Sequence, residues 1–126
     1  MKRIIIAIVF IVICLITAVV ELGYVGTNSN KYISQIEEID KMMKKDEFEE
    51  AIKLCRQTEN DWSKTEEKMD ILLIHDYVDD VSISLTQMRS HIENGNPDMY
   101  FAESDYAKKI LASIKGSEYP NFENIL

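Results

Sequence analysis

Hydrophobic positions divide the chain into one unbroken apolar run and a longer region in which apolar residues recur every three or four positions. The run extends from Ile4 to Val20, and Thr17 is its only side chain that is not plainly apolar. At about 1.5 Å per helical residue the run is roughly 25 Å long. Glu21 to Tyr24 add an interfacial flank, which brings the length close to the roughly 30 Å of a bilayer's hydrocarbon core. The pattern predicts a transmembrane helix.

The residues around the run favour a retained anchor over a cleaved signal peptide. A signal peptide carries small residues one and three positions before its cut. Ala18 and Gly26 are the candidate cut positions, but Ile16 and Tyr24 stand two positions before them. A lipoprotein site at Cys14 is disfavoured because the apolar run continues past it. We therefore predict a signal-anchor, with a cleaved leader as the alternative.

Charge around the run predicts its orientation. Lys2 and Arg3 precede the run, Glu21 follows it, and the next basic residue is Lys31. Basic flanks stay on the cytoplasmic side, so we expect a cytoplasmic N-terminus and an extracytoplasmic remainder. Removing Lys2 and Arg3 leaves 12 basic against 22 acidic residues, a net charge of −10. Such a domain is repelled by nucleic acid and by anionic lipids, so proteins, cations or uncharged surfaces are the expected partners.

The region after the run predicts an all-α fold: an N-terminal transmembrane helix followed by a small antiparallel bundle of three to four helices in two αα-hairpins. Glycine and polar residues predict a hinge at 23–30, with continuation of the anchor helix as the alternative. Whether the hairpins close into one bundle or stack as separate pairs stays open. The predicted divisions are 1–22 for the cytoplasmic tip and anchor, 23–30 for the hinge, 31–116 for the helical domain and 117–126 for an apolar C-terminal tail. Helices are expected over 32–44, 47–68, 70–94 and 97–115.

Helix ends and buried stripes follow from local patterns. Asp46 with Glu49 predicts a capping box, and Gly95 followed by Asn96 and Pro97 predicts one helix end and the next helix start. Asp70 is the expected cap of the third helix, and Glu37, Glu38, Asp40 and Lys41 are expected on the solvated side of the first. The predicted buried stripes are Ile33, Ile36, Ile39 and Met43; Phe48, Ala51, Ile52, Cys55, Trp62 and Met69; Ile74, Val78, Val81, Leu85, Met88 and Ile92; and Met99, Ala102, Tyr106, Ile110 and Ser113, widened by Ala107, Leu111 and Ile114.

The densest set of potential metal ligands lies near the start of the third helix. His75 and Asp79 are four residues apart, as are Asp76 and Asp80, so each pair can share a helix face. A divalent cation would need further carboxylates from a second helix. No Glu-x-x-His motif is present. We expect a solvated acidic face here, with a metal site as the alternative.

Motifs for catalysis or cofactor binding are missing from the chain. It contains no GxSxG, no His-Glu-x-x-His and, with four glycines, no glycine-rich phosphate loop. We therefore expect no catalytic residues, no cofactor and no enzymatic activity. Trp62, Tyr119 and Phe122 are candidate partner-docking residues, and a core position is the other interpretation of Trp62. No CxxC motif occurs, and Cys55 is expected to be a buried apolar residue, with an intermolecular disulfide as the alternative.

The Lys2-Arg3 start, the single apolar run, Trp62 and the stretch Leu72-Leu73-Ile74-His75-Asp76-Tyr77-Val78-Asp79 carry a resemblance to a known family. The chain resembles an uncharacterised domain-of-unknown-function family of short proteins found chiefly in spore-forming Gram-positive bacteria. The resemblance implies a single-span protein of the bacterial cell membrane without established activity, which works beside a multi-span membrane protein.

Three functional hypotheses follow. The first is a membrane-anchored helical interaction module or accessory subunit. The second is an extracytoplasmic sensor or ligand-binding bundle, for which Met1 to Arg3 would leave no cytoplasmic output domain. The third is an extracytoplasmic hydrolase, which would depend on His75 or His91.

Overall fold

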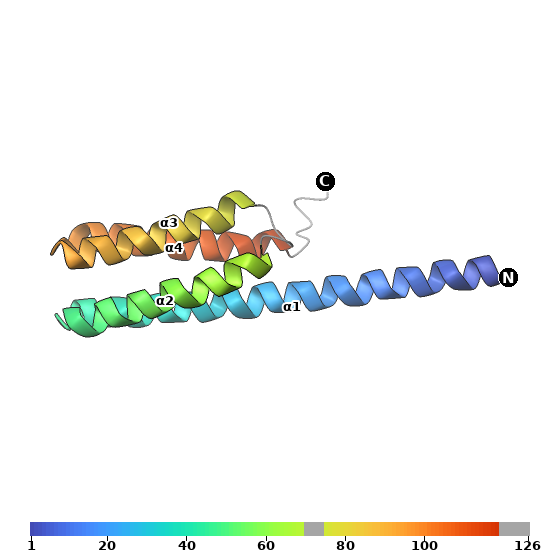
Figure 1. The fold of residues 1–126 in the computed structure, drawn as a ribbon, viewed down its shortest axis with the longest axis horizontal. Coiled ribbons are helices and arrows are strands. Elements are labelled where there is room, and N and C mark those ends of the chain that lie inside the picture. Colours follow the sequence, from blue (N-terminus) through green and yellow to red (C-terminus); the bar gives the residue numbers. More distant parts are fainter. Residues whose placement is uncertain (70–74, 119–126) are drawn as a thin grey trace.

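The computed structural model describes residues 1–69 and 75–118 and is all-α over those ranges, which confirms the predicted fold class. Its helices are α1 (Lys2–Lys44), α2 (Phe48–Met69), α3 (His75–Glu93) and α4 (Pro97–Glu118). At 43 residues α1 is about 65 Å long. Figure 1 shows that the C-terminal half of α1 lies in the bundle, while its N-terminal half projects beyond the other three helices.

The four helices form one closed antiparallel bundle. α1 contacts α2 and α4, and α3 contacts the same two helices, so each helix packs against its neighbours around a ring (Figure 1). The sequence left open whether the hairpins close into one bundle or stack as separate pairs. The structure shows a closed bundle. Both described interhelix turns lie at the end of the bundle opposite the projecting segment. The predicted cap Asp70 and the first stripe residue Ile74 fall outside the described residues.

The predicted hinge at 23–30 is wrong, because α1 continues through it without a break. Val25 and Ser29 are buried in the bundle, and the Asn28 amide donates to the Tyr24 carbonyl oxygen over 2.8 Å. Packing against α2 and α4 outweighs the weak helix propensity of glycine and asparagine. The helical domain therefore begins at Val25, six residues before the expected start.

The turn between α3 and α4 matches its prediction. Gly95 adopts a left-handed backbone with φ of 66°, and the Asn96 N–H donates to the His91 carbonyl oxygen over 2.9 Å. This is the Schellman geometry that ends many helices. Asn96 then caps α4 by accepting from the Met99 N–H at 3.3 Å, and Pro97 occupies the first helical position.

The predicted capping box at Asp46 is wrong, because Asp46 lies in the turn that ends α1. Asp46 has a φ of 58°, and the next N–H, that of Glu47, donates to the Met42 carbonyl oxygen at 2.9 Å. Asp46 therefore takes the place that Gly95 takes in the other turn, where it ends α1 instead of starting α2. Aspartate is one of the few residues other than glycine that adopts this conformation.

The buried stripe of α4 differs from the prediction. Met99 is 46% exposed, Tyr106 is 49% exposed, and Ala102 and Ser113 are also on the surface. Of the predicted line, Ile110 is buried. The residues predicted only to widen that line, Ala107, Leu111 and Ile114, lie in the core. Tyr100 and Ser104, which were not predicted to be buried, lie there too. Both lines have helical spacing, and the packing against α1 selects between them. α4 also continues past its predicted end at Gly116 to Glu118.

The buried stripes of α1, α2 and α3 agree in part with their predictions. From Val78 to Ile92 the α3 stripe is buried as predicted. In α1, Tyr32 is buried and Ile33 only partly so. In α2, Phe48 is 41% exposed and Ile52 is partly buried, whereas the threonines of that helix complete the core line. The buried residues of α2 are Ala51, Cys55, Thr58, Trp62, Thr65 and Met69.

Candidate functional site

The projecting half of α1 carries a continuous exposed apolar surface. Its large hydrophobic side chains from Ile4 to Val20 are exposed. Among the described residues α1 is the one helix long and apolar enough to cross a membrane, with a mean hydropathy of 3.2 in its most apolar window. An N-terminal signal sequence has the same length and composition. The segment can therefore cross a membrane by length and composition.

A buried carboxylate joins this helix to α4. Asp40 is 7% exposed, although the sequence predicted it on the solvated side of its helix. Its Oδ1 accepts from the Tyr100 hydroxyl at 2.7 Å and from the Ser104 hydroxyl at 2.6 Å. Its Oδ2 accepts from the Lys108 ammonium at 2.8 Å. Three consecutive turns of α4 thus hold one side chain of α1.

The ionisation of this cluster follows from its burial. Burial raises the pKa of the Tyr100 phenol, and the neighbouring Asp40 raises it further. The hydrogen bond to Asp40 raises the pKa of Lys108 above its ordinary value. At neutral pH the phenol is a neutral donor and the lysine is a cation, which is the combination that a buried carboxylate requires. The cluster fixes the register of α4 against α1.

A second polar cluster surrounds the single tryptophan. The Trp62 indole N–H donates to the Ser82 hydroxyl oxygen on α3 at 2.8 Å. The Trp62 ring meets the Tyr32 ring of α1 edge-to-face, with centroids 5.0 Å apart. The Tyr32 and Thr65 hydroxyl oxygens lie 2.6 Å apart. Trp62 is 1% exposed, so it is a core residue that joins three helices and offers no surface for docking.

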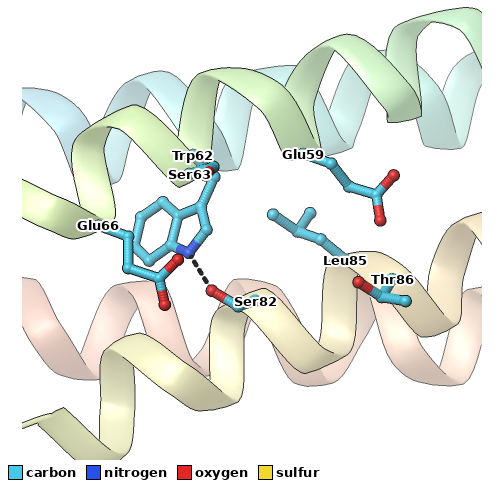
Figure 2. Close-up of a pocket in the computed structure, with 7 residues that line it drawn as sticks. All are labelled: Glu59, Trp62, Ser63, Glu66, Ser82, Leu85 and Thr86. Atoms are coloured by element: carbon cyan, nitrogen blue, oxygen red, sulfur yellow. Dashed lines mark hydrogen bonds between the residues drawn. The ribbon is translucent and has the colours of Figure 1, made fainter.

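A small cavity lies beside this indole, between α2 and α3 (Figure 2). Its volume is about 150 Å³. Glu59 and Glu66 flank it on α2, and Thr86 lies on α3 opposite them. Among the described residues no ion-pair partner of Glu66 is found, whereas Glu59 pairs with Arg89. The cavity therefore combines an aromatic edge, hydroxyl groups and one uncompensated carboxylate.

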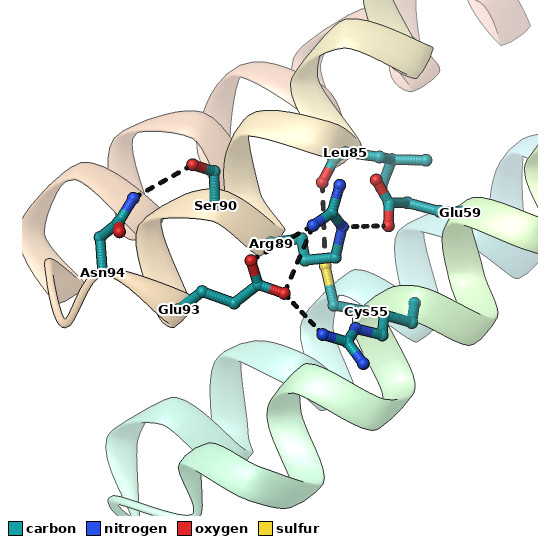
Figure 3. Close-up of polar contacts among 8 residues, drawn as sticks. Cys55, Glu59, Leu85, Arg89, Ser90, Glu93 and Asn94 are labelled. Carbon is teal, nitrogen blue, oxygen red and sulfur yellow. Dashed lines mark hydrogen bonds and ion pairs between the residues drawn. The ribbon is translucent and has the colours of Figure 1, made fainter.

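Charged side chains link α2 and α3 nearer the turns (Figure 3). Arg89 Nε donates to Glu59 at 2.7 Å, and its guanidinium also reaches Glu93 at 3.3 Å. Arg56 donates to the same Glu93 carboxylate at 2.8 Å. The hydrogen bond from Arg56 lowers the pKa of Glu93. Arg56 is largely exposed, so its pair with Glu93 adds little stability, whereas the Arg89–Glu59 pair is partly buried.

Cys55 lies under this network and is fully buried, as the sequence predicted. Its thiol approaches the Leu85 carbonyl oxygen at 3.8 Å (Figure 3). Burial raises the pKa of the thiol from 9.0 to about 12. Since the thiolate is the reactive form, this cysteine is chemically inert at neutral pH.

Among the side chains that the structure describes, the candidate metal ligands form no group that could hold a metal ion. Asp76 and Asp79 are exposed on α3 and Asp80 is partly exposed; the His75 side chain lies outside the described set. Within 1–69 and 75–118 no group of three or more potential ligands is close enough to hold a metal ion. The candidate docking residues Tyr119 and Phe122 are also outside the described residues.

Sequence reasoning missed Asp40 as a core residue. Asp40 follows Tyr32, Ile36 and Ile39 at helical spacing and precedes Met43, so its position in the buried stripe was visible. Its charge placed it on the solvated side, because ionised side chains are rarely buried without partners. The partners come from α4, sixty and more residues away, and no local pattern pairs them with Asp40.

Comparison with known proteins places the chain in a family. Residues 19–125 match Domain of unknown function (DUF4363). The chain belongs to this family. The DUF4363 match begins at the end of the apolar run and covers the whole bundle. Since DUF4363 is a domain of unknown function, the predicted membership of an uncharacterised family is confirmed. No curated protein and no solved structure matches the chain.

Proposed function

We propose that this DUF4363 protein is a single-pass protein of a bacterial cell membrane whose extracytoplasmic bundle is an interaction module, an accessory subunit of another membrane protein. The observation that carries the proposal is the continuity of α1. One helix contains both the apolar run and one wall of the bundle. Val25 is buried five residues after Val20, a distance of about 7.5 Å along the helix. The bundle therefore stands directly on the membrane surface.

The charge distribution supports the orientation. Lys2 and Arg3 precede the run, and the region after it carries the net charge of −10. An N-terminus that stays in the cytoplasm leaves the acidic bundle outside. The outer helix faces of the bundle are the surfaces that a partner can reach.

The topology is testable with cysteine labelling. A cysteine in place of Lys53, which is exposed on α2, is expected to react with a membrane-impermeant maleimide in intact cells. A cysteine in place of Lys2 is expected to react only after the cells are opened, because it lies in the cytoplasm. Labelling of Lys53→Cys only after lysis contradicts the proposed orientation. Recovery of a product without residues 1–22 contradicts the anchor.

The interaction role is testable by chemical crosslinking in native membranes, followed by affinity purification through a C-terminal tag and mass spectrometry. We expect one dominant membrane protein in the crosslinked fraction, and the same protein is expected to be lost when the bundle is deleted and the anchor retained. Crosslinked material that contains only the monomer overturns the proposal.

The cavity beside Trp62 favours ligand binding as a second candidate function. Its size, about 150 Å³, suits a molecule of a few heavy atoms, and Glu66 suits a cation. Small ammonium compounds are expected to raise the melting temperature and to change Trp62 fluorescence if the bundle is a sensor. Glu66→Gln abolishes that effect, whereas Glu67→Gln, on the exposed side of the same helix, preserves it. Equal titrations for both variants reject this candidate.

A further inference from the structure

The exposed stripe of α4 is as regular as the stripe in the core. Met99, Ala102, Tyr106 and Ser113 repeat at three, four and seven residues, so they share one line along the helix. Met99 is 46% exposed and Tyr106 is 49% exposed. Exposed apolar patches with a polar rim are a feature of interaction sites.

This line borders the seam between α3 and α4. Glu103 is four residues after Met99 and three before Tyr106, so all three lie on one side of α4. The Ser84 hydroxyl of α3 donates to the Glu103 carboxylate and to its carbonyl oxygen, each at 3.1 Å. The apolar line therefore runs along the edge of α4 that faces α3.

α3 contributes to the same seam from its side. Tyr77 and Asp80 precede Ser84 by seven and four residues, which places them on the edge of α3 that faces α4. Tyr77 is 42% exposed, and Ile83, on the outer surface of the same helix, is 55% exposed. Apolar side chains of two helices thus line one outer face, which we call the α3–α4 face and define by Tyr77, Ile83, Met99 and Tyr106.

Acidic side chains outnumber basic ones around this face, although Lys109, three residues after Tyr106, is exposed beside it. The side chains of Asp76, Asp79, Asp80 and Asp98 make no ion pair with any residue in the described ranges, and the first two and Asp98 are exposed. Asp76, Asp79 and Asp80 are also the acidic members of the candidate metal ligands that the sequence indicated. An apolar strip with an acidic border attracts a segment that carries apolar residues between lysines and arginines.

We infer that the α3–α4 face binds a basic amphipathic segment of the partner protein. This inference rests on the proposed interaction role and adds the location and chemistry of the contact. A helix with apolar residues at three- and four-residue spacing would lie along the strip, and its basic residues would meet the acidic border. A second copy of this chain is disfavoured as the occupant, because it would bring the same acidic border against itself.

The test uses site-specific photocrosslinking of the full chain in native membranes. Benzoylphenylalanine replaces Tyr106 on the α3–α4 face, and Lys53 or Asn60 on the exposed face of α2 as controls. We expect an adduct from position 106 and little from positions 53 and 60. Mass spectrometry of the adduct is expected to locate the contact in a basic amphipathic segment of another protein.

A charge series tests the complementarity. The triple variant Asp76→Asn, Asp80→Asn and Asp98→Asn is expected to lower the adduct yield roughly tenfold, since each exposed ion pair contributes about twofold to threefold. A matched triple on α2, in which Glu49, Glu50 and Glu67 become glutamine, removes the same charge and is expected to leave the yield unchanged. Circular dichroism checks that both triples remain helical.

The outcomes separate the inference from the proposed function. An adduct from α2 but not from position 106 overturns the inference and keeps the interaction role. The inference also fails if the captured segment is acidic, if it is a second copy of this chain, or if both triples lower the yield equally. No adduct from any position overturns the interaction role itself.

Discussion

At the scale of single residues, the two turns of the bundle place different residues in one backbone conformation. Asp46 has a φ of 58° and Gly95 a φ of 66°, and each ends a helix with the same pair of backbone hydrogen bonds. Glycine adopts this conformation without steric cost, whereas any Cβ approaches the following carbonyl oxygen. The turn between α1 and α2 therefore carries a conformational cost that the turn between α3 and α4 avoids.

Exchanging the residues of these turns is expected to have opposite effects. Asp46→Gly should stabilise the protein by about 0.5 kcal/mol, and Gly95→Ala should destabilise it by about 1 kcal/mol. A Cβ at Gly95 would meet no atom within 4 Å, so its cost is purely conformational. Urea unfolding in detergent, followed by Trp62 fluorescence, measures both changes. Stabilisation by Gly95→Ala would contradict the assignment of the turn.

Asp40 is expected to be the most sensitive polar residue of the core. Asp40→Ala leaves the Tyr100 and Ser104 hydroxyls and the Lys108 ammonium without their acceptor, which should cost about 3 kcal/mol. Glu37→Ala, on the exposed side of the same helix, removes an equal charge and should change stability by less than about 0.5 kcal/mol. Equal effects in urea unfolding would show that the cluster is not a stabilising contact.

The buried thiol of Cys55 makes the free energy of unfolding depend on pH in the alkaline range. Its pKa is about 12 in the folded protein against an ordinary 9.0, so above pH 9 the unfolded thiol ionises while the buried one stays neutral. The contribution is complete below pH 9 and is lost as pH rises toward 12. In a Cys14→Ser background, the parent should lose on the order of 1 kcal/mol more than its Cys55→Ala derivative between pH 7 and pH 10. Equal losses in urea unfolding would refute the assignment.

At the scale of helices, element ends depend on contacts as well as on local residues. The predicted end of α4 at Gly116 is wrong because the helix continues to Glu118. Near that end, the Lys115 ammonium lies 3.2 Å from the Asn30 side-chain oxygen of α1. Such a contact holds the last turns of α4 against α1, so glycine's weak helix propensity does not end the helix there.

Gly116→Ala should therefore stabilise the C-terminal end of α4 by about 0.5 to 1 kcal/mol, because glycine loses more backbone entropy than alanine in a helix. A Cβ at this position would meet no neighbouring atom within 4 Å. Hydrogen exchange of the amides at 113–118 is expected to slow about threefold in the variant. Faster exchange would show that Gly116 ends the helix.

At the scale of the whole molecule, the apolar half of α1 does not contribute to the folding stability of the bundle, although both share one helix. No core residue among the described ranges precedes Val25. Tyr24 packs against this core from the side, whereas the exposed side chains from Ile4 to Val20 take no part in it. The apolar run therefore does not hold the bundle together.

Removal of residues 1–20 is thus expected to give a helical protein that unfolds cooperatively. Far-UV circular dichroism during thermal unfolding checks this, with the detergent-solubilised full chain as the reference. The two melting temperatures should agree within a few degrees, since the core is unchanged. A truncated chain without a cooperative transition would show that the anchor contributes to folding.

Much of the fold was predictable because its signals are local. The α3 stripe from Val78 to Ile92 has a single apolar face, and Gly95-Asn96-Pro97 specifies a helix end and start by its own backbone preferences. The α4 stripe was predicted wrongly because that helix has two lines of helical spacing. Asp40 was missed because a charged residue in a core needs partners that a neighbouring segment cannot reveal.

The sequence by itself determined the helical content, the acidic character, and the single segment able to enter a bilayer, because hydropathy, charge and backbone preference belong to the residues themselves. Only the tertiary structure decided that 23–30 is helix, that Asp40 is buried, and that Met99, Ala102, Tyr106 and Ser113 face outward while Ile110 of the same line is buried. Those outcomes depend on which distant side chains meet. The free energy of such contacts outweighs the smaller propensities of single residues.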